Sequence, residues 1–320
     1  MGFSHRMQRL GFMKIFKLIV ERLIIMVVTI FILITVVFFA LSFMPADPVS
    51  IICGPGATEE SIRATRKEFG LDDPSYIQYF TFLKNLVQGN LGFSWRSRNL
   101  VIEEIKSAIP YTAILAATAM MIATVLGILT GTISAKKQFS LIDNVSMGIS
   151  LIGVSTPIFI LALFIIYIFA YRLEWFPTSG SESIRHLILP SVCLGLFVAA
   201  SIARLVRASM LDILRQDYIR TARAKGLSEV RVIFKHAFRN ALIPILTIVG
   251  MQFGLLLGGS VITETVFAWP GLGRLIITSI NFKDAPLLQG GVLFFASGFM
   301  LINLITDILY QFIDPRIKIK

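Results

Sequence analysis

Six long runs without Asp, Glu, Lys or Arg limit what this sequence can fold into. Each run is rich in Ile, Leu, Val and Phe, and together they cover Leu23–Ala46, Ser107–Ala135, Asn144–Tyr171, His186–Ala203, Asn240–Thr263 and Ala285–Thr306. A helix needs about 20 apolar residues to cross the hydrocarbon core of a bilayer, and only helices satisfy their own backbone there at this length. The sequence therefore predicts an all-α, polytopic membrane protein with six transmembrane helices.

The composition of the 320 residues supports this class. Hydrophobic residues make up 55% of the chain and charged residues 15%, whereas soluble domains carry about 25% charged residues. These values exclude a disordered chain, a coiled coil and a disulfide scaffold. The two cysteines, Cys53 and Cys193, are too few for a disulfide framework.

The distribution of basic residues predicts the orientation. If both termini are cytoplasmic, the inner segments carry 19 of the 30 Lys and Arg residues and the outer segments carry 11. This asymmetry follows the positive-inside rule, so the net charge of +11 requires no nucleic-acid partner. The first run has 24 residues, more than the roughly 7 to 15 of a signal peptide's hydrophobic region, and is predicted to be a retained anchor in the cell (inner) membrane. An interfacial helix is expected before it, carrying Phe12, Lys14, Ile15, Phe16, Lys17 and Ile19.

The outer loop between the first two runs carries signals for two short helices. Thr58–Phe69 has acidic residues in its first turn and basic residues in its last, and Gly70 follows it. A second helix is predicted from Pro74, capped by Asp73, to Gly89. These helices are expected to lie on the outer membrane surface, to form a docking rim for an external partner, or to do both. One face of the second helix carries Tyr76, Tyr79, Phe80, Leu83 and Leu86.

The inner loop between the fourth and fifth runs is the most informative segment. The fourth span is predicted to lengthen toward Met210 and to continue as a polar helix through Arg223, with Gly226 just after its end. Ser228 is predicted to cap a second short helix. An apolar face without a core of its own must be covered either by a partner protein or by lipid headgroups. That face carries Val230, Ile233, Phe234, Ala237 and Phe238, opposite Arg231, Lys235 and Arg239.

The sequence predicts no catalytic residue and no metal site. No lysine follows a glycine, so the chain contains no Gly-Lys-Ser/Thr phosphate-binding loop. The three histidines, His5, His186 and His236, are scattered among a terminus, an outer edge and the inner loop.

A few polar residues within the spans are candidates for the translocation path. Asp307 and Asn303 lie near the inner end of the last span, where Asp307 either pairs with a basic residue or lines the path. Glu264 lies at the outer end of the fifth span, either at the pore mouth or as an interfacial charge. Gln252 either faces the pore or bonds to a neighbouring helix. In the same span, Gly250, Gly254 and Gly258 form a smooth face for helix packing or for sliding during gating.

Ordered short motifs extend over about 270 residues. The segment Asp217–Ser228 resembles the cytoplasmic signature of ABC-transporter permeases, and more closely their peptide and nickel importer branch. Other matching motifs are Pro45–Pro48, Gly70–Pro74, Gly89–Gly92, Ser155–Pro157, Arg239–Pro244, Trp269–Arg274, Gln289–Gly290 and Asp314–Arg316.

The resemblance implies a type I ABC importer permease fold in three parts. Residues 1–104 hold the N-terminal segment, the first helix and the outer loop; residues 105–312 form the permease domain, with a coupling loop at about 210–240; and residues 313–320 form a cytoplasmic tail. The residues implied in coupling to ATPases are Asp217, Arg220, Ala222, Gly226, Ser228, Phe234 and Phe238. Arg220-Thr221-Ala222 replaces the family's Glu-Ala-Ala, and Asp217 is a candidate substitute for the missing carboxylate.

The implied machine is an ATP-driven importer of di- or oligopeptides that works by alternating access. Its other parts are a second homologous permease, two cytoplasmic ATP-binding subunits and an extracytoplasmic substrate-binding protein. ATP and Mg²⁺ bind those ATPases, and this chain holds no cofactor. Nickel or a metal chelate is the alternative cargo. A stand-alone secondary carrier is disfavoured because its spans need ionisable groups near the midplane, and an intramembrane enzyme is the third alternative.

Overall fold

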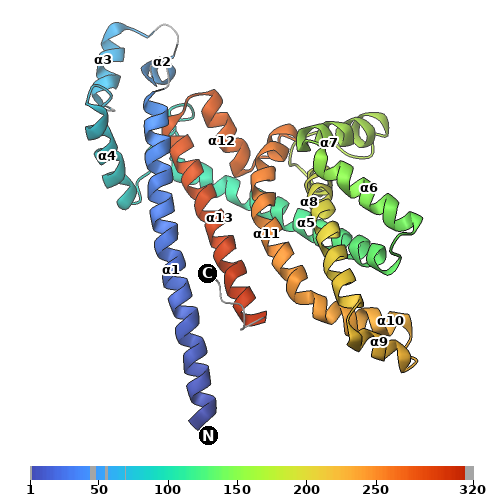
Figure 1. Ribbon diagram of the computed structural model, residues 1–320. Coiled ribbons are helices and arrows are strands. Elements are labelled where there is room, and N and C mark those ends of the chain that lie inside the picture. Colours follow the sequence, from blue (N-terminus) through green and yellow to red (C-terminus); the bar gives the residue numbers. More distant parts are fainter. Residues whose placement is uncertain (1, 44–47, 55–56, 69, 314–320) are drawn as a thin grey trace. The chain divides into compact units, whose positions relative to one another are not determined.

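The computed structural model describes residues 2–43, 48–54, 57–68 and 70–313. Within these ranges the chain is helical between its loops, apart from one isolated bridge between Phe93 and Leu100. This confirms the all-α prediction. The helices shown in Figure 1 are α1 Gly2–Ser42, α2 Pro48–Cys53, α3 Glu59–Glu68, α4 Ser75–Val87, α5 Val101–Lys136, α6 Leu141–Ser155, α7 Ile158–Ile165, α8 Ile184–Leu214, α9 Asp217–Ala224, α10 Glu229–Arg231, α11 Phe238–Val266, α12 Leu272–Asn281 and α13 Ala285–Ile313; two π-helical segments are η1 Ile166–Arg172 and η2 Val232–Ala237.

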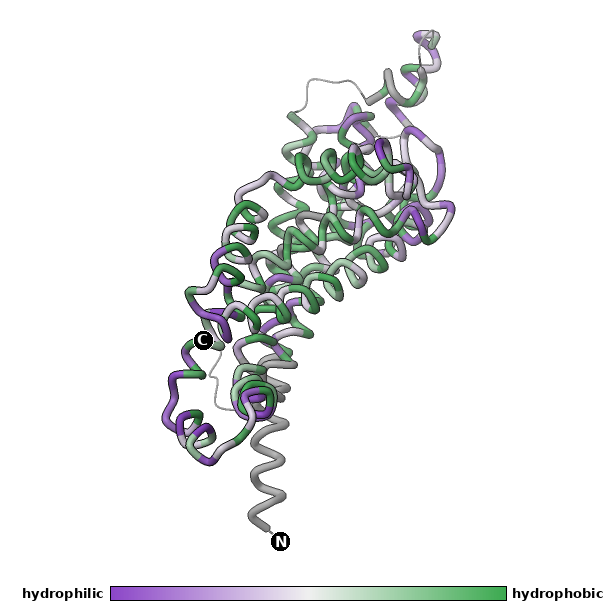
Figure 2. Tube along the Cα trace, turned by 90° about the vertical axis from the view of Figure 1, so that its right-hand side faces the viewer, coloured by the Kyte–Doolittle hydropathy of each residue, from purple (hydrophilic) through white to green (hydrophobic). Residues whose placement is uncertain are grey.

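Four described helices are long and apolar enough to cross a membrane. They are Ile19–Ser42 of α1, α5, α8 and Ala285–Ile308 of α13. Hydrophobic residues dominate these helices, whereas hydrophilic residues gather in loops and short helices (Figure 2). Two bent helix pairs raise the number to six if each pair forms one span. The predicted six crossings therefore hold only when the third and fifth runs are counted as broken spans.

The third run does not form one straight helix. Its two halves, Leu141–Ser155 and Ile158–Arg172, are bent by 109° at the residues Thr156 and Pro157. Pro157 has no backbone N–H and disfavours a helical conformation at the residue before it. Thr156 accordingly adopts φ −83° and ψ 124°. The expectation of an uninterrupted span over Asn144–Tyr171 is therefore wrong.

The fifth run lies in α11 but is also bent. The segments Glu229–Leu242 and Pro244–Gly258 differ in direction by 54°. Pro244 lies inside the helix, where it removes a backbone hydrogen bond and its ring crowds the preceding turn. The bend is therefore explained by Pro244.

The chain divides into two compact units. The first comprises the N-terminal part of α1 up to Phe16, residues Ala113–Trp269 and the chain from Leu301 onward. Within it, α8 packs against α6 and α11, and α7 packs against α8 and α11. Buried small and branched residues form this core, including Leu194, Ile202 and Val206 of α8. These contacts place α9 and α10 at the end of α8 and before α11 (Figure 1).

The second unit comprises Lys17–Thr112 and Pro270–Met300. Its core joins the start of α5 to α12 and α13 through Val101, Ile105, Ala108, Leu272 and Leu287. The buried Asp284 carboxylate accepts hydrogen bonds from the Ser94 hydroxyl at 2.5 Å and from the Leu287 N–H at 3.2 Å, which fixes the start of α13.

The outer-loop helices form close to where they were predicted. Gly70 (φ +61°) follows α3 and Gly89 (φ +73°) follows α4, both in the left-handed region. Pro74 occupies the N-cap position of α4, so the expected cap by Asp73 is wrong. Tyr79 and Phe82 pack on Phe38 of α1, with ring centroids 5.2 and 5.6 Å away.

The short helices α2 and α12 were not predicted. The motifs at residues 45–47 and 314–316 lie outside the described residues. The side chains of the expected interfacial helix are described only from Ile19 onward, although its backbone is helical. The division at residues 104 and 312 stays a prediction.

Candidate functional site

The candidate site is the segment between α8 and α11. α8 ends at Leu214, and Gln216 adopts an extended conformation (φ −70°, ψ 149°) before α9 begins at Asp217. The prediction of one helix continuing from the fourth span through Arg223 is therefore wrong. Because the chain turns at Gln216, α9 packs against η2 instead of extending the span.

Gly226 ends α9 as predicted. Its φ is +75°, a conformation that costs glycine little and other residues more. The Gly226 N–H donates to the Arg223 carbonyl at 2.9 Å, and the Leu227 N–H donates to the Ala222 carbonyl at 3.4 Å. This is the Schellman pattern of helix termination. A Cβ at Gly226 would meet no atom within 4 Å, so the requirement for glycine is one of backbone conformation.

Ser228 occupies the N-cap position of α10, but its hydroxyl makes no capping hydrogen bond. Its carbonyl oxygen instead accepts a bond from the Val232 N–H at 3.0 Å. The position of the helix start was therefore predicted correctly, and the side-chain cap was not.

The apolar face predicted for this second helix divides into two parts. Val230 and Phe234 are each 61% exposed, and the half-buried Phe238 ring lies 6.4 Å from the Phe234 ring. The face divides because η2 is π-helical, with i→i+5 hydrogen bonds in place of the expected α-helical register. The residues buried against the rest of the unit are Val232, Ile233 and Ala237.

Polar contacts tie the short helices to one another. The Arg223 guanidinium donates to both carboxylate oxygens of Glu229, at 3.2 and 2.7 Å. These hydrogen bonds raise the pKa of Arg223 above its ordinary value. The Asn240 amide donates to the Tyr218 hydroxyl at 2.9 Å. Together they join α9 to α10 and to the start of α11, so the exposed aromatic side chains stand on a braced segment.

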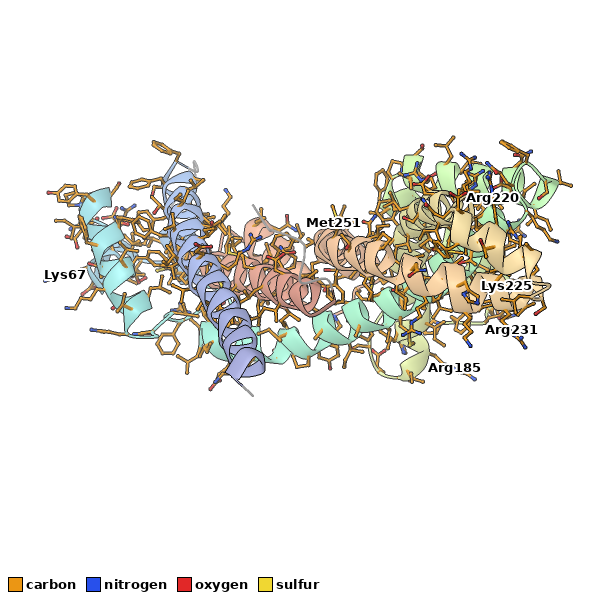
Figure 3. All side chains as sticks on the ribbon, turned by 60° about the horizontal axis from the view of Figure 1, so that its bottom comes forward. Lys67, Arg185, Arg220, Lys225, Arg231 and Met251 are labelled. Carbon is orange, nitrogen blue, oxygen red and sulfur yellow. The ribbon has the colours of Figure 1, made fainter. Side chains whose placement is uncertain are left out.

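The surface around these aromatic residues is basic. Residues 215–239 contain seven Lys and Arg residues and two acidic residues. Figure 3 shows Arg220 and Arg231 on α9 and α10, and Lys225 just after α9, at the same end of the first unit. Asp217 is almost fully exposed and lies 3.7 Å from Arg220, whereas Ala222 is buried. The segment therefore offers a basic surface with two adjacent phenylalanine rings, which suits a protein surface with an apolar cleft and acidic residues.

A buried ion pair that the sequence did not predict supports this unit. Asp143 in the first turn of α6 accepts two hydrogen bonds from Arg207 of α8. It also accepts from the Phe139 N–H at 2.9 Å, and its own N–H donates to the Ser140 hydroxyl at 3.3 Å. The Ser-x-x-Asp capping pattern was the available signal.

The predicted path residues do not share one environment. Gln252 is buried and Glu264 is fully buried, while Asn303 and Asp307 are half-buried. The backbone N–H of Trp269 donates to the Glu264 carbonyl at 2.8 Å, which folds the chain back over the end of α11.

Gly258 of the predicted glycine face makes no close helix contact, whereas two glycines of α5 do. Gly258 is exposed, and a Cβ there would meet no atom within 4 Å. On α5, a Cβ at Gly131 would lie 2.6 Å from the Ala203 carbonyl oxygen of α8, and Gly127 is equally close to Ile202. Gly127 and Gly131 therefore permit the close approach of α5 to α8. Within the described residues, no group of three or more His, Cys, Asp or Glu side chains is placed to hold a metal ion.

Two stretches of the sequence match known protein families. Residues 123–319 match the family "Binding-protein-dependent transport system inner membrane component". Residues 15–116 match the corresponding N-terminal family, "Binding-prot-dependent transport system membrane comp, N-term". The two matches together extend over most of the chain.

Individual relatives are similar over nearly their full length. The glutathione transport system permease protein GsiC of Shigella flexneri serotype 5b (strain 8401) is 45% identical over 302 residues, covering 94% of this chain and 99% of the relative. The protein of the same name from Escherichia coli (strain K12) is 44% identical with the same coverage.

Solved structures share the fold at low sequence identity. A chain of the MetNI methionine ABC transporter in an inward-facing conformation aligns with a TM-score of 0.58 and 20% identity, covering 66% of this chain and 96% of that chain. A chain of an amino acid ABC transporter gives a TM-score of 0.52 and 17% identity, with 68% and 95% coverage.

Proposed function

Because the chain belongs to the family of binding-protein-dependent transport system inner membrane components, we propose that it forms half of a heterodimeric pore that imports di- or oligopeptides. The chain is a permease subunit of an ABC importer with the type I importer fold. Its family works with ATPase and substrate-binding partners. In the proposed complex these are a second related permease, two cytoplasmic ATPases that hold ATP and Mg²⁺, and an external binding protein.

The exposed Phe234 ring beside Phe238 is the observation that carries the coupling role. The segment that carries this exposed ring is already folded and is held by the hydrogen bonds between Arg223 and Glu229. A movement of a protein bound to the ring can therefore be passed on to the permease. In the proposed mechanism, closure of the ATPases on ATP moves α9, α10 and η2. Because η2 packs against α8 and leads into α11, the movement reorients the spans and alternates access to the pore.

The names of the relatives support a peptide cargo. Glutathione, named for the Shigella and Escherichia proteins, is a tripeptide, so it falls within the proposed di- and oligopeptide class. The external binding protein sets most of the choice among such cargoes. Nickel or a metal chelate is the competing cargo for the same machine.

Uptake in cells that lack only this chain tests the proposal. Labelled dipeptide, tripeptide, glutathione and nickel are supplied separately, with and without the restored gene. The expected result is restored uptake of at least one peptide class and unchanged nickel uptake. Restoration of nickel uptake alone would replace the peptide assignment with the metal alternative.

Both termini are proposed to be cytoplasmic in the cell membrane. Single cysteines at Glu229 and Glu182, in a chain whose Cys53 and Cys193 are replaced by Ser, distinguish the two sides. An impermeant thiol reagent applied to intact cells is expected to label position 182 and not position 229. Labelling in the opposite order would invert the proposed orientation.

A further inference from the structure

The second unit contains a pocket of its own. It has a volume of about 290 Å³ and is formed by the end of α1, the loop between α3 and α4, one face of α4, the loop before α5 and the start of α13. Small-molecule sites begin at about 300 Å³, so this pocket suits a small ligand. On the proposed topology the pocket opens on the extracytoplasmic side.

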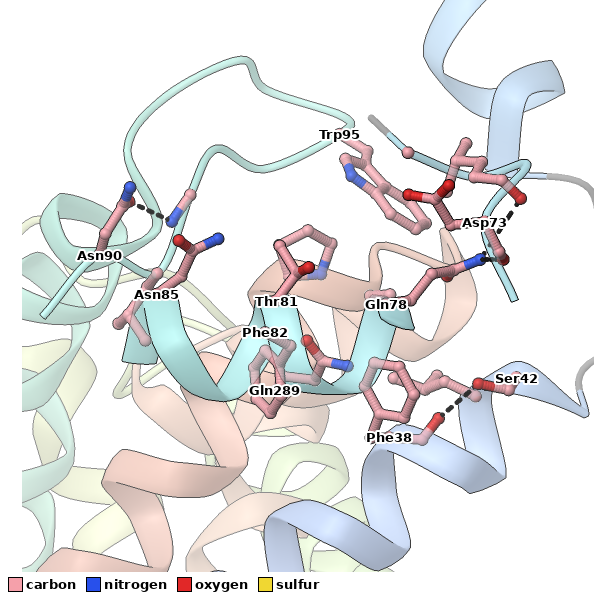
Figure 4. A pocket seen from close by; sticks show the side chains of 17 residues that line it. Phe38, Ser42, Asp73, Gln78, Thr81, Phe82, Asn85, Asn90, Trp95 and Gln289 are labelled. Carbon is pink, nitrogen blue, oxygen red and sulfur yellow. Dashed lines mark hydrogen bonds between the residues drawn. The ribbon is translucent and has the colours of Figure 1, made fainter. Parts of the chain in front are cut away.

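The pocket combines an aromatic floor with amide side chains. Phe38 and Phe82 stack with their ring centroids 5.6 Å apart. Figure 4 shows Gln78, Thr81 and Asn85 along α4. Side-chain amides offer one acceptor and two donors, the same chemistry as a peptide group. The pocket therefore matches a ligand in which amide groups alternate with small apolar side chains.

Several polar side chains that line the pocket make no hydrogen bond within the described residues. Hydrogen bonds engage the Gln78 amide nitrogen, which donates to the Asp73 and Leu71 carbonyls at 2.8 and 3.3 Å. In the described part of the chain, no hydrogen bond engages the side chains of Asn85, Gln289 or Trp95, which also line the pocket. These groups are available to a ligand, and water or a ligand must satisfy them.

The charge of the pocket lining is negative and comes from one residue. Asp73 is the one ionisable group among the lining residues, and no Lys, Arg or His accompanies it. Its carboxylate has no ion-pair partner in the described part of the chain. Figure 4 shows Asp73 beyond Gln78 at one end, and Asn85 and Asn90 at the other. A ligand with a cationic end and a neutral, amide-containing body fits this arrangement.

We propose that this pocket binds the free amino terminus and the first residues of a short peptide on the permease itself. The Asp73 carboxylate accepts hydrogen bonds from the ammonium group. The amides of Asn85 and Gln289 bond to the peptide groups, and the Phe38 and Phe82 rings contact the side chains. This inference rests on the proposed peptide cargo and assigns this chain a receiving site separate from the binding protein.

Binding of tri-alanine to the membrane complex without its binding protein tests the proposal. The complex is placed in lipid nanodiscs, and tritiated tri-alanine and N-acetyl-tri-alanine are compared by equilibrium dialysis. The expected result is saturable binding of tri-alanine that acetylation weakens at least about tenfold, because a charge-assisted hydrogen bond is lost. Asp73→Asn is expected to weaken tri-alanine binding by a similar factor and to abolish the difference between the two peptides.

Two matched variants control for indirect effects. Asp72→Asn removes the neighbouring carboxylate, which lies 3.6 Å from Arg66 and does not line the pocket. Gln88→Ala removes an exposed amide just after α4 and is compared with Asn85→Ala. Asp72→Asn and Gln88→Ala are expected to bind tri-alanine like the unchanged complex, whereas Asn85→Ala binds more weakly.

The outcomes separate this inference from the proposed function. Absence of saturable binding, or equal binding of both peptides to the unchanged complex and to Asp73→Asn, would overturn the receiving site. Peptide uptake by cells would then still support the importer. Failure of peptide uptake in cells with an assembled complex would instead overturn the peptide cargo.

Discussion

The Arg207 guanidinium holds the Asp143 carboxylate with two hydrogen bonds, from Nε at 2.6 Å and from Nη2 at 2.7 Å. Asp143 is almost completely buried, and the pair joins the start of α6 to the C-terminal half of α8. The same carboxylate fixes the backbone of Phe139, which adopts a φ of +64°. The turn between α5 and α6 and the helix leading to the candidate coupling segment are therefore held by one contact.

Removing one partner of this pair is expected to destabilise the chain. Arg207→Met leaves the Asp143 carboxylate buried without its cation, which costs about 3–5 kcal/mol in other proteins. Thermal unfolding in detergent should show a clear drop for Arg207→Met and a partial recovery for the double change Asp143→Leu with Arg207→Met. The exposed pair Arg63–Glu59 serves as control, and Arg63→Met should leave the midpoint unchanged. Equal drops in the unfolding midpoint for Arg207→Met and Arg63→Met would contradict the stabilising role of the Asp143–Arg207 pair.

Gly226 is expected to tolerate asparagine and not valine. Both changes place a Cβ where no atom lies within 4 Å, so they differ only in their tolerance of φ +75°. Asparagine visits the left-handed region readily, whereas a β-branched residue there is an outlier. Transport should therefore be largely retained in Gly226→Asn and lost in Gly226→Val, with both proteins inserted in the membrane. Normal transport by Gly226→Val would show that the turn needs no left-handed residue.

Phe234→Ala is expected to weaken coupling to the ATPases. Full burial of a Phe side chain contributes roughly 1.5–3 kcal/mol, so the affinity for the ATPases should fall about ten- to a hundredfold. ATPase activity of the complex should then no longer respond to loaded binding protein. Phe164→Ala on α7 is the matched control, because that side chain is 60% exposed against 61% for Phe234. A stimulated rate in Phe234→Ala equal to that of the control would remove Phe234 from the coupling surface.

Gly131 and Gly258 are expected to respond differently to alanine. At Gly131 the new methyl group meets the Ala203 carbonyl oxygen at 2.6 Å and the Val206 Cβ at 2.8 Å. Overpacking of this kind costs roughly 1–3 kcal/mol. Thermal unfolding should therefore occur earlier in Gly131→Ala and be unchanged in Gly258→Ala, where the methyl group enters open space. The reverse order would restore the packing role first assigned to Gly250, Gly254 and Gly258.

Local features of the sequence determined the helical class, the apolar runs and the ends of several helices. Membrane crossing depends on the apolar length of a single segment, so α5, α8 and α13 could be predicted from composition along the chain. Gly70, Gly89 and Gly226 end their helices because the left-handed conformation is a property of one residue. Their positions required no knowledge of distant contacts.

Tertiary structure alone decided which side chains of those helices meet. The turn at Gln216 and the π-helical register of η2 divide the face that 3.6-residue periodicity had grouped around Phe234. The ion-paired residues Asp143 and Arg207 are 64 residues apart, and the pocket of the second unit joins five segments between residues 38 and 289. Such contacts depend on how helices pack over long sequence separations, and no local pattern of hydrophobic residues records that packing.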